Sequence, residues 1–331
     1  MAIVRSHLRF LLTQREFFPA GAPGGRALIL GVQDVHATHD QLAATIQSGG
    51  MNPVSIPAAE RSYTASQVVR GDRRLAHVKD LFRMLGYARV DTLDFSEAER
   101  PDLVHDLNEP IPAEWAGRYD LLLDVGVVEH VCDVYQALAN CMALIKPGGS
   151  AIHIVPLSGW HNMVFFNFQP PYFAEVYGAN GFEPTQTFIN FYPQYDEWRD
   201  RPMVYREYRY GDEMIFLEPR KFSNICFFAR RARAVEPFVK PLQGFYLRYH
   251  GERDADGGQR VAAELDGRLA ADVKRRLPGW LLGPLLTLNR WRLSVEDVLL
   301  PYAIRERLWC WRRQRYLRAL DRTRDRKTLR I

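Results

Sequence analysis

The stretch RYDLLLDVGVVEHV, residues 118–131, decides the fold that we expect for this chain. Its apolar run, residues 121–123, is uninterrupted, and the chain then reaches Gly126. An uninterrupted apolar run is typical of a strand in a parallel sheet, because helices cover both faces of such a sheet. An acid and a histidine, Glu129 and His130, follow the glycine closely. The stretch therefore predicts a buried strand that delivers polar groups to one edge of a sheet.

Strands and helices alternate on both sides of this stretch. Apolar residues recur at helical spacing in residues 72–86, where Gly86 is a typical helix end, and again in residues 134–145. The other expected strands are RALILGV at 26–32, RVDTLDF at 89–95, DLVHDL at 102–107 and SAIHIVPL at 150–157. This alternation predicts an α/β fold with a parallel sheet.

Two further strands are expected downstream, EPTQTFINFY at 183–192 and SNICFFAR at 223–230. The tyrosine-rich and charged stretch between them, about 193–222, is interpreted as an insertion. The predicted organisation is an N-terminal segment at 1–25, a main domain at 26–231 and a basic helical C-terminal extension at 232–331.

Composition is that of an ordinary globular protein, with 331 residues of which 47% are hydrophobic and 25% charged. No apolar run approaches the roughly 20 residues that span a bilayer. The N-terminal apolar run is interrupted by Arg9 and Arg15, so we do not expect a signal peptide. The four cysteines lie far apart without a C-x-x-C pair, which favours reduced thiols and a cytoplasmic protein.

Acidic residues stand at the ends of several predicted strands. Asp94 ends the second strand, Asp106 the third and Asp124 the fourth, while Gly31 ends the first. In doubly wound sheets, ligands bind outside the carboxyl ends of the strands. Carboxylates there can accept hydrogen bonds from ribose hydroxyls and from an adenine amino group. We therefore expect a nucleoside-containing ligand at this edge.

From about residue 80 to 157 the chain resembles class I S-adenosylmethionine-dependent methyltransferases of the type 11 kind, which act on small molecules or glycans. The matching stretches are LFRMLGYARVDTLDFSE, DLVHDLNEPIP, RYDLLLDVGVVEHV and LIKPGGSAIHIVP. The resemblance implies a doubly wound, mostly parallel seven-stranded sheet of Rossmann-like type, whose last two strands form an antiparallel hairpin. It also implies S-adenosyl-L-methionine as cofactor and methyl transfer to a small-molecule or glycan-precursor acceptor.

The resemblance assigns cofactor-binding roles to residues at the strand ends. Asp94 matches the acid that holds the cofactor ribose, and Asp106 and Leu107 match positions beside the adenine. Asp124 and Val125 match residues that line the cofactor after the fourth strand.

Two histidines are candidate bases for an acceptor hydroxyl. Glu129 and His130 match the pair that opens the next helix, beside the methionine end of the cofactor. His161 lies in the aromatic stretch 156–173, which in the family faces the acceptor. A base helps when the methyl acceptor must lose a proton, so we predict His130 and His161 as catalytic candidates.

The loop after the first strand departs from the family. The family has a G-x-G-x-G loop there, whereas this chain has LGVQDVHATHD with Gly31 alone. Glycines let backbone approach a ligand closely, so Gln33 and Asp34 would have to line this wall. Gly31 and Asp34 are therefore the candidate cofactor residues here.

Two other classes of protein remain open. One is a non-catalytic, methyltransferase-like scaffold whose degenerate loop no longer binds cofactor and whose basic C-terminal segment binds a membrane surface or a partner. The other is a nicotinamide-dependent Rossmann enzyme, against which the absent G-x-G-x-x-G argues. His36 and His39 lie in a D-x-H-x-x-H-D pattern, but no second element offers further ligands, so we predict no metal site.

The C-terminal end carries the basic character of the chain. Residues 301–331 hold eleven Lys or Arg and three Asp or Glu, so the net charge of +5 leaves −3 for residues 1–300. Tryptophan and arginine together there suit a solvated helix docked on the main domain, or peripheral contact through 280–331 with the inner face of a membrane. Nucleic acid is a third interpretation and the one that we do not favour.

Overall fold

The computed structural model describes residues 3–17, 24–71, 74–191, 203–208, 222–243 and 328–330. The chain divides into two compact units, and all described residues except Leu242 and Gln243 belong to the first. That unit comprises Met1–Tyr210, Pro219–Pro241 and Lys327–Ile331, and the second comprises Gly211–Glu218 and Leu242–Arg326. Most of the insertion and of the C-terminal extension predicted from the sequence, including 280–326, lies outside the described residues.

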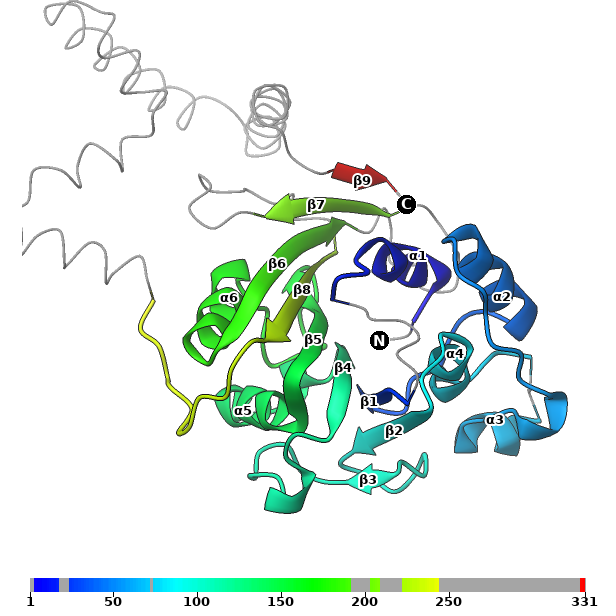
Figure 1. The fold of residues 1–331 in the computed structure, drawn as a ribbon, viewed down its shortest axis with the longest axis horizontal. Coiled ribbons are helices and arrows are strands. Elements are labelled where there is room, and N and C mark those ends of the chain that lie inside the picture. Colours follow the sequence, from blue (N-terminus) through cyan, green and yellow to red (C-terminus); the bar gives the residue numbers. More distant parts are fainter. Residues whose placement is uncertain are drawn as a thin grey trace, which may run out of the picture. The chain divides into compact units, whose positions relative to one another are not determined.

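Within the described part of the chain, nine strands form one sheet in the order β3-β2-β1-β4-β5-β8-β6-β7-β9 (Figure 1). The strands are β1 Arg26–Leu30, β2 Arg89–Asp94, β3 Leu103–Val104, β4 Tyr119–Val125, β5 Ile145–Ser158, β6 Phe182–Phe191, β7 Val204–Tyr208, β8 Ser223–Arg231 and β9 Thr328–Arg330. Strands β1 to β5 pair in parallel, and β8 lies antiparallel between β5 and β6. The mostly parallel seven-stranded sheet with its antiparallel hairpin is thereby confirmed, and β7 and β9 extend its edge.

Helices cover both faces of the sheet (Figure 1). They are α1 Arg5–Thr13, α2 His39–Ser48, α3 Ala65–Arg70, α4 Val78–Met84, α5 Val134–Leu144 and α6 Pro170–Ala179, with short 3-10 turns η1 Ala58–Glu60, η2 Ala113–Trp115 and η3 Val128–His130. Helices α5 and α6 lie on one side of the sheet, and α1, α2 and α4 on the other. Among the described residues, no helix has both the length and the apolar content to span a bilayer.

Capping side chains set where the predicted helices begin. The helix predicted within 72–86 begins only at Val78, because His77 caps it by accepting a hydrogen bond from the Lys79 amide at 3.0 Å. Asp133 caps α5 in the same way, accepting from the Gln136 amide at 3.0 Å. Local hydrogen bonds thus mark the first residue of both α4 and α5.

The N-terminal helix belongs to the same core as the sheet. Phe10 of α1 stacks on Tyr205 of β7, with ring centroids 3.8 Å apart, and meets Phe188 of β6 edge-on at 5.0 Å. All three rings are fully buried. Buried aromatic contacts of this kind contribute strongly to the stability of a core. Helix α1 therefore belongs to the core of the sheet at β6 and β7.

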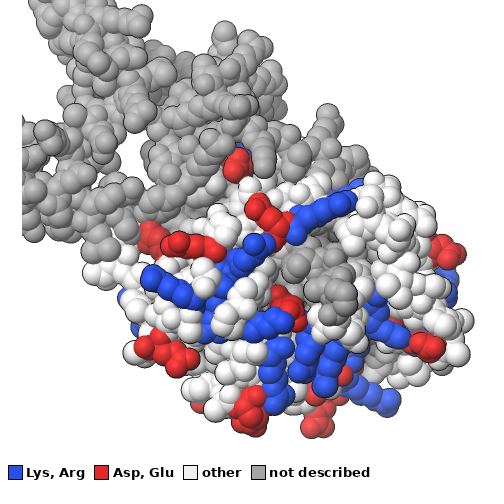
Figure 2. Space-filling view, in the orientation of Figure 1, with Lys and Arg blue, Asp and Glu red and all other residues white. Residues whose placement is uncertain are grey.

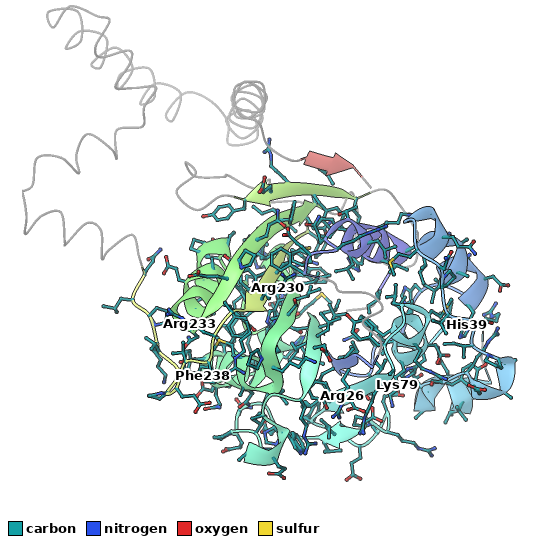
Figure 3. All side chains as sticks on the ribbon, viewed as in Figure 1. Arg26, His39, Lys79, Arg230, Arg233 and Phe238 are labelled. Carbon is teal, nitrogen blue, oxygen red and sulfur yellow. The ribbon has the colours of Figure 1, made fainter. Side chains whose placement is uncertain are left out.

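The amino ends of the parallel strands are held by ion pairs. Asp91, which is 3% exposed, pairs with Arg26 at 3.3 Å and with Arg89 at 2.9 Å, and accepts from the Tyr119 hydroxyl. Lys146 pairs with Asp120 nearby. Lysine and arginine side chains gather on the face seen in Figure 2, and Figure 3 places Arg26 there. These contacts at the amino ends of the strands have a structural role, and the candidate site lies at the opposite, carboxyl ends of the strands.

Candidate functional site

Three loops meet at Gly31, directly after β1. The Gly31 amide donates to the Leu93 carbonyl of β2 at 2.7 Å, and its φ of +72° is a conformation that favours glycine. A Cβ at this position would lie 3.2 Å from Val127 Cγ2 and 4.0 Å from Asp94 Oδ2. The carboxyl ends of β1, β2 and β4 thus bring Gly31, Asp94 and Val127 together, as the strand order predicts.

Asp94 has the geometry of a ligand-binding acid. It is half-buried, and its Oδ1 accepts a hydrogen bond from the Ser96 amide at 3.1 Å. That bond fixes the carboxylate while Oδ2 faces Gly31. A carboxylate held in this way can accept two hydrogen bonds from neighbouring hydroxyls.

Phe95 presents an aromatic ring beside this acid. Its side chain is 80% exposed, which is unusual for phenylalanine. We did not single out Phe95 from the sequence, although an aromatic residue directly after a candidate ribose acid was a usable signal. An exposed ring at a ligand edge offers a stacking surface for a planar group.

Asp106 lies in a surface turn between β3 and β4. Its Oδ1 accepts from the Asn108 amide at 2.9 Å and from the Asn108 side chain at 2.7 Å, and these bonds lower the pKa of Asp106. Leu107 is buried, and its carbonyl accepts from Asn140 of α5 at 3.1 Å. The turn is therefore anchored to α5 and keeps the Asp106 carboxylate at the surface.

The Asp124 side chain points away from this edge. It is fully buried, its Oδ1 accepts from the Val127 amide at 2.9 Å, and its Oδ2 lies 2.8 Å from His153 Nδ1. His153 Nε2 lies 2.5 Å from the Tyr177 hydroxyl of α6. Both ring nitrogens of His153 therefore have a hydrogen-bonding partner inside the protein. Asp124 can thus contribute backbone, but its carboxylate serves the interior.

The Gln33 side chain covers the ends of β1 and β4. It is buried, and its Nε2 donates to the Val125 carbonyl at 3.2 Å and to the Leu30 carbonyl at 3.4 Å. The same nitrogen would lie 3.0 Å from a Cβ at Gly31. Gln33 therefore fills space that a second glycine would leave open.

Asp34 lies on another side of this loop. Its carbonyl accepts from the Ile3 amide at 3.1 Å, and its backbone pairs with His77. Its Oδ1 is buried without a hydrogen-bond partner among the described residues. The loop is thereby tied to the N-terminal segment, and Asp34 does not share the contacts of Gln33.

Glu129 and His130 lie in η3 and precede α5 rather than opening it. Glu129 is 1% exposed, and its Oε2 has no hydrogen-bond partner among the described residues. Burial raises the pKa of Glu129 well above its usual value, and the Asp124 carboxylate adds to this rise. His130 is exposed at its surface side, and partial burial lowers its pKa. Burial thus disfavours the charged form of both side chains.

The loop after β5 is fastened to the same turn. The amides of Phe165 and Phe166 donate to the Glu129 carbonyl at 3.1 and 3.2 Å. His161 is exposed in this loop, and Asn162 has a φ of +65°. These hydrogen bonds join the turn that contains His130 to the loop that contains His161, at the carboxyl ends of the strands.

The histidines of the candidate metal pattern have other roles. His39 Nε2 lies 2.9 Å from Asp80 Oδ2 and is buried between α2 and α4, where Figure 3 labels it near Lys79. His36 donates its backbone amide to the Ile3 carbonyl at 2.8 Å. Within the residues that the structure describes, no group of three or more metal-ligating side chains occurs.

The strand order and the hairpin define the class. A parallel run β3-β2-β1-β4-β5, continued by an antiparallel strand between the fifth and sixth, is the fold of the class I S-adenosylmethionine-dependent methyltransferases. The order and the direction of the strands are the evidence for this fold in the chain.

Several known proteins to which the chain is similar are methyltransferases. A ubiquinone biosynthesis O-methyltransferase from Aromatoleum aromaticum is 33% identical over 67 residues, which are 20% of this chain and 28% of that relative. A methyltransferase from Thermotoga maritima aligns with 67% of this chain and 89% of its own, at 13% identity and a TM-score of 0.31. One from Archaeoglobus fulgidus aligns with 67% and 94%, at 10% identity and a TM-score of 0.33. No family model matches the chain.

Proposed function

We propose that this chain is an S-adenosylmethionine-dependent methyltransferase that acts on a small-molecule or sugar and glycan-precursor acceptor. The observation that carries the proposal is the Asp94 carboxylate, held by Ser96 and facing the positive-φ Gly31 at the carboxyl ends of β2 and β1. The fold supports it, because this edge is where ligands of doubly wound sheets bind.

The residues at this edge fit a nucleoside with a cationic tail. Asp94 offers acceptors for the ribose hydroxyls, and exposed Phe95 offers a face for the adenine ring. Asp106 and Leu107 lie on the next loop, where we propose that they border the adenine. Gly31 and the backbone of Asp124 and Val125 supply the close wall, with Glu129 beyond them.

Once bound, the cofactor supplies a methyl group activated by its sulfonium sulfur. The chain must then position the acceptor in line, exclude water and take up a proton where the acceptor is a hydroxyl. His130 suits the last task, because partial burial lowers its pKa and so favours the form of the imidazole that can accept a proton. His161 is the second candidate base, on the loop bonded to Glu129.

The loop after β5 is proposed to face the acceptor. Met163, Phe165 and Phe166 are 50%, 73% and 37% exposed, so this short loop offers three large apolar side chains to solvent. The adjacent imidazole of His161 and side-chain amide of Asn162 can orient a polar acceptor group. An acceptor with both an apolar and a polar part fits this loop.

Calorimetric titration with S-adenosylmethionine and S-adenosylhomocysteine tests the proposal. We expect micromolar binding that Asp94→Ala weakens by about 1 to 3 kcal/mol, the usual cost of a lost charged hydrogen bond. Glu97→Ala is the matched control, because Glu97 is an exposed acid three residues away. Absence of heat and of thermal stabilisation at millimolar ligand, with the protein folded, would refute the proposal.

The position of Gln33 favours a second candidate function. Its side chain covers the ends of β1 and β4, as expected of a methyltransferase-like scaffold without catalysis. Gln33→Gly separates the two functions, and Gln33→Leu, which keeps the bulk, is the control. If the site is functional, the wild type binds cofactor and Gln33→Gly binds it only several-fold more tightly. If Gln33 closes the site, the wild type does not bind cofactor and Gln33→Gly does.

Three predictions from the sequence remain proposals. They are the cytoplasmic location, the boundaries at residues 25 and 231, and peripheral membrane contact through 280–331. Sedimentation of the full chain with vesicles that contain anionic lipid tests the last. Binding that falls as salt rises is expected for basic residues at such a surface.

A further inference from the structure

Asn190 of β6 is a fully buried side chain whose amide group has no hydrogen-bond partner. The residue is 0% exposed, and neither its Oδ1 nor its Nδ2 has a partner among the described residues. Buried side-chain amides are nearly always hydrogen-bonded, because removing an unpaired one from water is costly. Asn180 is the usual case: it is also 0% exposed, and its Nδ2 donates to the carbonyls of Val176 at 2.8 Å and of Val239 at 3.0 Å. The unpaired amide of Asn190 therefore points to a partner that the described part of the fold does not supply.

The strand register places Asn190 at the carboxyl ends of the parallel strands. Asn190 pairs with Asn224 of β8, and Asn224 pairs with Pro156 of β5; these strands are adjacent in the sheet (Figure 1). Strand β5 ends two residues later, at Ser158. Asn190 thus lies in the row of the sheet from which the loop after β5 departs, and that loop is the one proposed to face the acceptor.

Asn190 lies on the face of the sheet that α1 covers. Its register partner on β7, Tyr205, stacks on Phe10 of α1, and directly opposite residues in antiparallel strands direct their side chains to the same face. Phe188, two residues before Asn190 on β6, meets the same Phe10 ring and shares its face with Asn190. Both relationships place the amide on the α1 side of the sheet, beside an aromatic cluster.

Aromatic side chains connect this cluster to the loop after β5. Trp160 of that loop meets Phe222 edge-on, with ring centroids 5.1 Å apart. Trp160 and Tyr205 belong to one buried hydrophobic cluster, against which Phe222 and Val164 pack while they remain partly exposed. Phe222 and Val164 are therefore the side chains that a ligand would displace in order to reach Asn190.

We propose that Asn190 recognises an uncharged hydroxyl, carbonyl or amide group on a ring-containing acceptor. The inference rests on the proposed function and narrows its acceptor to a molecule whose ring packs on Trp160 and Phe222. A side-chain amide has two donor hydrogens and an acceptor oxygen, so it can bind a group of either kind. Asn224 and Tyr205, which flank Asn190 in register, are uncharged residues. An ionised acceptor group would be buried there without a counter-ion from either neighbour, which is costly.

The stability of two asparagine variants tests whether the Asn190 amide is unpaired. Asn190→Leu keeps the approximate size of the side chain and removes the amide, so we expect a melting temperature equal to or above that of the wild type. Asn180→Leu is the matched control, because it removes a buried amide that is paired, and it should lower the melting temperature by several degrees. An equal fall in both variants would show that the Asn190 amide serves the fold, and would overturn the inference.

Ligand-observed NMR with small ring compounds tests recognition itself. The full chain, saturated with S-adenosylhomocysteine, is titrated with benzamide and benzyl alcohol, and with benzoate as the charged analogue. We expect the two neutral compounds to bind more tightly than benzoate. Asn190→Leu should weaken them roughly tenfold, the order expected for lost hydrogen bonds, and leave the affinity for S-adenosylhomocysteine unchanged.

The two ligand classes separate failure of the inference from failure of the proposed function. Absence of binding by both neutral compounds at millimolar concentration, tighter binding of benzoate, or unchanged affinity in Asn190→Leu overturns the inference. Each of these results leaves the proposed function intact as long as S-adenosylhomocysteine binds. A folded wild type that does not bind S-adenosylhomocysteine refutes the proposed function, and the inference with it.

Discussion

His153 Nδ1 lies 2.8 Å from Asp124 Oδ2, and both side chains are fully buried. The two residues are also register partners in the parallel β4–β5 pair. Through Tyr177, the contact continues to α6 on the covering layer. The strand end that borders the candidate site is thus fixed from behind by an internal hydrogen-bonded chain.

Removing the histidine from this chain should strongly destabilise the fold. His153→Leu leaves the Asp124 carboxylate buried without its main partner, and we expect a loss of about 3 to 5 kcal/mol in unfolding free energy. Tyr177→Phe removes one hydroxyl and should cost about 1 kcal/mol. Denaturant unfolding measures both, and equal effects of the two variants would contradict the role given to His153.

Gly31 should tolerate alanine less well than another glycine in the same conformation. Gly71 also has a positive φ, +66°, but a Cβ there meets no atom within 4 Å. Both Gly→Ala changes carry about 1 to 2 kcal/mol of backbone strain. Gly31→Ala adds contacts at 3.0 Å with Gln33 and 3.2 Å with Val127, for about 1 to 3 kcal/mol more. Unfolding free energies of the two variants that agree within error would show that Gly31 is not crowded.

Phe95 should contribute to cofactor affinity and not to stability. Its ring is 80% exposed, so Phe95→Ala removes little buried surface. If the ring stacks on adenine, affinity should fall by about 1 to 3 kcal/mol, and Phe95→Trp should restore it. Calorimetry and thermal unfolding measure the two quantities. A variant that binds normally would remove Phe95 from the site.

Stability should fall on acidification because of His77. Burial, with the nearby Lys79 charge, lowers the pKa of His77 from 6.5 to about 4. Between these values the unfolded chain binds a proton that the folded chain does not, so unfolding free energy falls as the pH drops from about 7 to 4. The shift corresponds to at most about 3 kcal/mol.

His77→Asn is the variant that isolates this effect. Asparagine can still cap α4, as His77 does through the Lys79 amide, but it does not titrate. Denaturant unfolding at pH 7 and pH 4.5 should show a smaller loss in the variant than in the wild type. The same loss in both would assign the acid sensitivity to other groups, such as His7, whose pKa burial also lowers to about 4.

The local sequence pattern was sufficient to predict most strands of the central sheet. The strand predicted at 119–125 is β4, and its three leucines are fully buried, because an apolar run covered on both faces can adopt few other structures. The helix predicted from 134–145 is α5 for the same kind of reason. The edge strands β7 and β9 escaped prediction, since pairing with β6 and β7 rather than their own pattern creates them.

The sequence by itself determined the alternation of strands and helices, and hence which residues end each strand. Hydrophobic spacing encodes these features, because burial of a periodic apolar face depends on neighbours within the element. Only the tertiary structure decided where each side chain at those ends points. Asp94 faces Gly31 whereas Asp124 turns to His153, and Gln33 lies over β1 and β4 while Asp34 does not. Such directions depend on partners distant in the sequence, and those partners come together only when the sheet is complete.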